Sequence, residues 1–144
     1  MQKSYKDADF GEFKYDERME WYIGQINFAA GEVDVCLSAE DEESFNKSLA
    51  TLHELFGKLS EIDKSAKDFA AAELLDEKNS TWQAEGESDT TAEEFKERIA
   101  LESIVIGSGT SVEFFYDDDG LFFDHAILLT RHQDGNWVSA EVAD

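Results

Sequence analysis

Apolar and polar residues alternate along the first forty positions of the chain. Phe13 and Tyr15 are followed by the apolar stretch 21–28 and then by the alternating stretch 33–38. A period of two residues is typical of a strand with one buried face. Turn-forming residues separate the three stretches. The segment therefore predicts a three-stranded antiparallel meander with short connections.

The hydrophobic period changes after residue 38. Five apolar residues then recur at spacings of three and four: Phe45, Leu49, Leu52, Phe56 and Leu59. This spacing places them on one face of a helix, and a similar stripe follows over 62–75. One continuous helix over 41–77 would measure about 55 Å. We therefore expect two helices, with a break near residues 57–60.

A short third helix and a second set of strands complete the pattern. Thr91 and Glu94 have the spacing of a capping box, which predicts a helix that continues to about residue 101. Residues 79–90 resemble a loop, which we expect Trp82 to hold against the core. The period of two then returns in four stretches: 104–106, 112–116, 121–129 and 137–142.

These elements predict a single α+β domain over residues 1–144. Short connections favour antiparallel pairing between successive strands. We expect an antiparallel sheet built from an N-terminal three-stranded meander and a C-terminal four-stranded meander. Two to three helices lie between the meanders in the sequence and pack on one face of the sheet.

Several segments of this pattern resemble a known bacterial family. The segments are Phe10–Asp16, Trp21–Ile26, Phe95–Ile99, Leu101–Ile104 and Phe114–Asp118 with Phe122–Ile127. Together they resemble the family called domain of unknown function 2262 (DUF2262) over nearly the whole chain. Asp124 departs from the family pattern, in which glycine is more frequent before the histidine. The family has no established activity, so the resemblance implies a fold and a bacterial origin but no mechanism.

The charge of the chain limits the partners that it can have. The 144 residues include 34 Asp and Glu against 12 Lys and Arg, a formal net charge of −22. Such a field repels nucleic-acid phosphates and anionic lipids, so we expect neither nucleic acid nor a membrane as a partner. The same field attracts a basic protein. Solubility alone is the other explanation of the charge.

The sequence also favours a location in the cytoplasm. The first residues lack the apolar core of a signal peptide, and no run of about 18 apolar residues is present. Cys36 is the only cysteine, which excludes an internal disulfide. We expect Cys36 to pack within a strand.

No catalytic motif can be recognised, so we assign no catalytic residue and no cofactor. His125 is the first candidate for a ligand site, because Asp124 beside it could tune the imidazole. We add Tyr116 to this candidate site, and a packed structural role for His125 is the alternative. His53 and His132 lack the spacing of metal ligands, so we expect no metal. The acidic stretch 117–120 lacks calcium-loop spacing and predicts a hairpin turn.

Aromatic residues are the other candidates for function. Some occur in consecutive pairs, and adjacent residues in a strand point to opposite faces, so some must lie off the core face. We assign a partner surface to Trp21, Tyr22 and Trp137. Helices or a second copy of the chain could instead cover these residues.

The leading hypothesis is a non-catalytic protein-binding module for a basic partner, as an immunity protein is for a nuclease-type toxin. The alternative is a small-ligand binder or an enzyme with a pocket around His125. A third hypothesis is a homo-oligomer in which the exposed aromatic residues form the interface between its own subunits.

Overall fold

The computed structural model describes residues 2–29, 31–107, 109 and 111–143. An eight-stranded sheet has its strands in the same order in space as in the chain. The strands are β1 (Ser4–Asp7), β2 (Gly11–Asp16), β3 (Trp21–Phe28), β4 (Gly31–Ser38), β5 (Ala100–Ile106), β6 (Ser111–Asp117), β7 (Ala126–His132) and β8 (Trp137–Ala143). The helices are α1 (Glu42–Phe56), α2 (Leu59–Thr81) and α3 (Ala92–Arg98).

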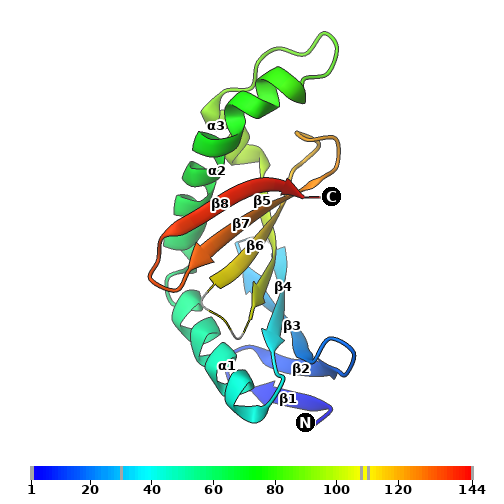
Figure 1. Cartoon of the computed structure of the whole chain (residues 1–144), viewed down its shortest axis with the longest axis vertical. Helices are drawn as coiled ribbons and strands as arrows, with labels where there is room; N and C mark the ends of the chain where they lie inside the picture. The colour runs from blue at the N-terminus through cyan, green and yellow to red at the C-terminus, as the bar shows by residue number, and fades with distance from the viewer. Residues whose placement is uncertain (1, 30, 108, 110, 144) are drawn as a thin grey trace.

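The sheet consists of two antiparallel meanders, β1–β4 and β5–β8, that lie side by side. The central strands β4 and β5 are parallel, with Val35 opposite Ile104. A parallel neighbour requires a connection that crosses back along the sheet. The three helices form this connection, and Figure 1 shows α1 and α2 following each other along the sheet.

Two parts of the predicted sheet are wrong. The N-terminal meander has four strands instead of three, because the short polar stretch Ser4–Asp7 pairs with β2. The sheet is not wholly antiparallel, because the helical connection returns the chain to the sheet edge in its original direction. The C-terminal meander has four strands as predicted, although β7 begins at Ala126 and not at residue 121.

The helices begin and end close to the predicted positions. Asp41 accepts a hydrogen bond from the backbone N–H of Ser44 and so caps α1, which satisfies a free donor of the first turn. The predicted break is confirmed, since α1 ends at Phe56 and α2 begins at Leu59. The capping box of Thr91 and Glu94 is also confirmed. The second helix is longer than predicted and includes residues 79–81.

The core lies between the helices and one face of the sheet. Alternate strand residues are buried there, as in β6, where Val112, Phe114 and Tyr116 are buried and their neighbours are less so. The buried side of α1 includes Phe45 and Leu52. Burying each such side chain contributes about 1.5–3 kcal/mol. Within the described residues, no helix combines the length and the apolar character that a membrane span requires.

Candidate binding sites

One face of the sheet lies opposite the helical core, and strand register shows which residues it carries. Residues that pair directly across antiparallel strands share a face. Cys36 pairs with Ile23 on one side and Val105 on the other, within a first row that crosses all eight strands: Ser4, Lys14, Ile23, Cys36, Val105, Glu113, Thr130 and Ser139. A second row lies two residues along the strands: Gln25, Asp34, Ser103, Phe115, Leu128 and Glu141. We call these two rows the open face.

The open face combines an apolar middle with acidic residues. Ile23 is 38% exposed, and Val105, Phe115 and Leu128 are half-buried. The two rows hold three carboxylates, Asp34, Glu113 and Glu141, and one basic residue, Lys14 of β2. Apolar side chains that lie among carboxylates suit a surface that receives a basic protein.

Cys36 lies within the open face but is not arranged as a nucleophile. Partial burial, with a further contribution from Asp34, raises the pKa of its thiol. A reactive cysteine needs the opposite shift, since the thiolate is the reactive form. The half-buried side chain in β4 agrees with the predicted packing role.

The three predicted partner residues lie in different surroundings. Tyr22 is buried, and its hydroxyl donates a hydrogen bond of 2.6 Å to the carbonyl of Gln2. Trp137 stacks on Phe69 and donates from Nε1 to Ser65 Oγ at 2.8 Å, which ties β8 to α2. Both contacts are structural.

Trp21 differs from the other two aromatic residues. It pairs with Ser38 two residues before Ile23, so it lies at the edge of the open face. Its indole N–H is buried and has no hydrogen-bond partner within the part of the chain that the structure describes. Of the three aromatic residues, Trp21 is therefore the one that the strand register assigns to this surface.

The predicted ligand residues His125, Asp124 and Tyr116 make separate contacts. Nδ1 of His125 donates to the carbonyl of Phe122 at 2.6 Å, and its ring contacts Trp82. The Trp82 contact agrees with the expected anchoring role of this tryptophan. Asp124 is exposed, with a positive φ of 67°.

Tyr116 is fully buried and donates to Asp63 at 2.5 Å. Burial, the nearby carboxylate charge and this hydrogen bond raise the pKa of Tyr116. These hydrogen bonds of Tyr116 and His125 go to different partners, and each fits a packing role.

The acidic stretch 117–120 forms a turn and stabilises the loop that precedes β7. Asp119 and Gly120 both have positive φ, and the N–H of Leu121 donates to the carbonyl of Asp118. A turn forms at the Asp-Gly pair, but it is not the predicted hairpin turn, because the chain continues through a longer loop before β7 begins at Ala126. The buried carboxylate of Asp118 accepts hydrogen bonds from the N–H groups of Gly120, Phe122 and His125.

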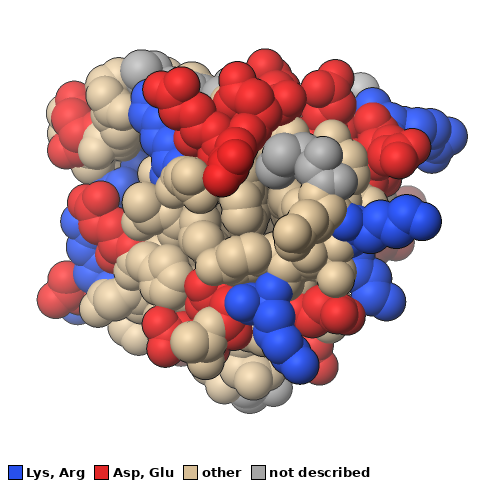
Figure 2. Space-filling view, turned by 90° about the horizontal axis from the view of Figure 1, so that it is seen from below, with Lys and Arg blue, Asp and Glu red and all other residues tan. Residues whose placement is uncertain are grey.

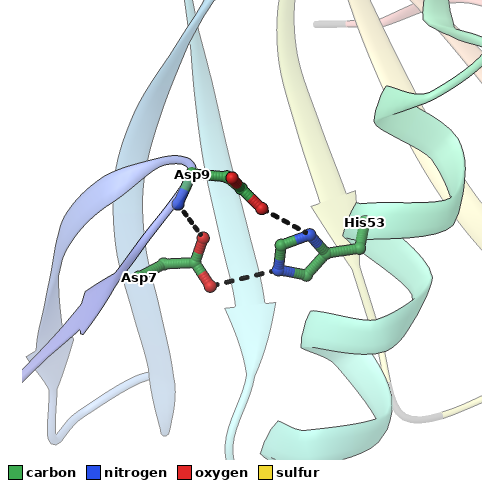
Figure 3. Close-up of side chains that lie close together, drawn as sticks. All are labelled: Asp7, Asp9 and His53. Carbon is green, nitrogen blue, oxygen red and sulfur yellow. Dashed lines mark hydrogen bonds and ion pairs between the residues drawn. The ribbon is translucent and has the colours of Figure 1, made fainter.

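A cluster that the sequence did not suggest joins β1 to α1 (Figure 3). Nε2 of His53 lies 3.1 Å from Oδ1 of Asp7, and Nδ1 lies 3.6 Å from Oδ2 of Asp9. The three side chains could together offer one nitrogen and two oxygen ligands to a divalent cation. A neutral imidazole carries one N–H, so only a protonated ring can donate to both carboxylates. Hydrogen bonds within the cluster account for its geometry without a metal. Asp7 and His53 are 46 residues apart in the chain, so no local sequence pattern predicted their contact.

Asp7 is the buried member of this cluster. Burial alone would raise its pKa, but hydrogen bonds from the N–H of Asp9, the His53 side chain and the N–H of Phe10 lower it below the ordinary value. Asp7 is therefore held in its ionised form.

The acidic residues do not coat the molecule evenly. Figure 2 looks onto the end that α1 and the first strands form in Figure 1. Acidic side chains gather along one border of this end, and uncharged side chains fill its centre. Uncharged surface is thus available next to strongly acidic surface.

The fold defines an α+β protein with a mostly antiparallel eight-stranded sheet and three helices in the described chain. A model of uncharacterised proteins conserved in bacteria, DUF2262, matches residues 7–142. The chain belongs to this family, as the sequence resemblance implied. Searches for similar curated proteins and for similar solved structures gave no match.

Proposed function

We propose that this chain is a non-catalytic binding module that receives a basic protein on its open face. The observation that carries the proposal is the composition of that face: two rows with an apolar middle and three carboxylates, against one basic residue, Lys14, at the β2 end. The apolar side chains would lose water on binding and supply affinity, while the carboxylates would select a partner of positive charge.

The charge of the open face also argues against other occupants. Nucleic acid and anionic membranes require cations that displace counterions, and the two rows contain one lysine against three carboxylates. A second copy of the chain would place its own Asp34, Glu113 and Glu141 near the same residues. Like charges at close range destabilise such an interface. A basic toxin or another basic protein fits this chemistry, by class analogy with immunity proteins.

The experiment is capture from a bacterial lysate on the immobilised full chain at low and moderate salt. The test variant carries Phe115→Ala and Leu128→Ala, a directly paired couple at the apolar middle. The control is Met19→Ala, which shortens a side chain that is 53% exposed outside the two rows. Thermal unfolding of all three proteins checks the fold.

We expect wild type and the Met19 variant to retain the same basic protein, and the double variant to lose it. Moderate salt should weaken retention, because screening reduces the attraction between opposite charges. Retention by the double variant, or capture of no specific protein, would contradict the proposal and leave solubility as the role of the net charge.

A further inference from the structure

A buried arginine lies away from the open face, near the end of the helix-covered side of β7. Ile127, Leu129 and Arg131 occupy alternate positions of the strand and are all buried. Arg131 is only 9% exposed. Its guanidinium lies beside Gly135 in the β7–β8 turn, where an added Cβ would meet Nη2 at 3.4 Å. Among the described residues, no hydrogen bond or ion pair to this guanidinium is formed.

Arg131 lines a cavity of about 400 Å³ between α1 and the ends of the C-terminal strands. Lys47 and Thr51 of α1, Ser111 of β6 and His132 of β7 line the same cavity. This volume lies in the range of small-molecule sites, roughly 300–1,000 Å³. The cavity therefore combines polar donors with room for a small ligand.

The two carboxylates at this cavity have other partners. Asp134 pairs with His132 at 3.2 Å, and Glu54 pairs with Lys58 at 3.8 Å. Lys47 and Arg131 form no ion pair within the described part of the chain, although the sequence supplies 34 acidic residues. Two cationic side chains are thus left for an anion that enters from solvent.

The energetics of Arg131 point in the same direction. A guanidinium stays protonated at all relevant pH values. Burying a charge without an opposite charge or hydrogen-bond acceptors is strongly unfavourable. No guanidinium nitrogen of Arg131 is both fully buried and without a partner, so the charged group keeps contact with solvent through the cavity. An anion that enters the cavity would supply the opposite charge.

We propose that this cavity binds the oxyanion group of a small molecule, a phosphate or a carboxylate. The planar guanidinium of Arg131 donates two parallel hydrogen bonds to two oxygens of the anion. Lys47 adds a second positive charge at the cavity mouth, since its side chain is exposed. The proposal is independent of the open face, which lies on the other side of the sheet, so each can fail without the other.

The test is thermal unfolding of the full chain during titration with sodium phosphate and, separately, sodium malonate, each against sodium chloride at equal ionic strength. A ligand that binds only the folded state raises the midpoint and does so in a saturable way. A shift with phosphate identifies a phosphate site, and a shift with malonate a carboxylate site. Failure of both anions to exceed chloride would overturn the proposal.

Variants then locate the site. Arg131→Met keeps the length of the side chain and removes the guanidinium, so we expect no shift with the anion. Arg18→Met is the matched control at an exposed arginine in the β2–β3 turn and should keep the full shift. Lys47→Gln, at an exposed position of α1, should weaken binding several-fold. An undiminished shift in both the Arg131 and Lys47 variants would place the anion elsewhere and refute the assignment.

Discussion

Gly24 in β3 is the position where the fold depends most directly on a missing side chain. A Cβ added there would lie 2.5 Å from Cε1 and 3.0 Å from Cγ of Phe13, and closer still to Cδ1. Phe13 is fully buried, so its ring has no free space into which it can turn. Overpacking of this kind costs about 1–3 kcal/mol. Because three ring atoms are involved, we expect Gly24→Ala to cost about 3 kcal/mol, the upper end of that range.

The assay is urea unfolding, supported by thermal unfolding. A loss of about 3 kcal/mol in a chain of this size lowers the midpoint by roughly 6–12 °C. Gly31→Ala is the control, because an added Cβ there meets nothing within 4 Å. We expect that control to be neutral or to stabilise the strand by about 0.5–1 kcal/mol.

A double-mutant cycle separates the clash from other effects. Phe13→Ala alone removes a buried ring and should cost about 3–5 kcal/mol. In that background Gly24→Ala should cost almost nothing, because the ring that it would strike is gone. Equal costs of Gly24→Ala in both backgrounds would refute this explanation.

Two further predictions concern buried carboxylates. Asp118→Ala removes the acceptor of three backbone N–H groups in the loop before β7. This change should lower the free energy of unfolding by about 3 kcal/mol in urea, whereas Asp117→Ala, at the exposed neighbouring position, should change it little. Similar losses in both variants would contradict the role of Asp118. Asp7 has a lowered pKa in the folded state, so its stabilising effect is present above its unfolded value, about 3.9, and is lost as the pH falls through the lower folded value. Asp7→Asn should therefore be less stable than wild type near neutral pH, and the difference in unfolding free energy should shrink below about pH 4. A difference that stays constant across that range would refute the proposed effect of Asp7 ionisation on stability.

Local patterns predicted most of the elements, and the errors have local causes. The period-two and helical stripes identified seven strands, the helix break and the capping box, because each depends on residues within one element. The strand β1 was missed because Ser4–Asp7 contains one apolar residue and acquires its place only by pairing with β2. The parallel pair β4 and β5 joins residues about seventy positions apart in the chain, which no local period records. The apolar run at 121–123 resembles the start of a strand, but hydrogen bonds to Asp118 hold residues 122 and 125 in a loop.

Sites were harder to predict than elements, because they depend on contacts between distant segments. Asp7 and His53 meet only after β1 and α1 pack together. The burial of Arg131 could have been predicted from the sequence, because Arg131 continues the buried alternation of Ile127 and Leu129 along β7. An arginine in phase with a buried period is rarer than an exposed one.

The two consecutive phenylalanine pairs, at 114–115 and 122–123, each place one aromatic side chain in the core and one outside it. Adjacent strand residues point to opposite faces, and Phe114 and Phe115 do so in β6: Phe114 is in the core, and Phe115 pairs with Leu128 on the open face. Phe122 and Phe123 lie in the loop before β7, with Phe122 buried and Phe123 52% exposed. Apolar residues therefore lie off the core face both in a strand, as Phe115 does, and in a loop, as Phe123 does. Only the strand residue lies beside the carboxylates of a regular sheet surface. There the pairing of neighbouring strands fixes the positions of the side chains before any partner binds. Such preorganisation lowers the entropy lost on binding, which favours the open face over the loop as the place where a basic protein would bind.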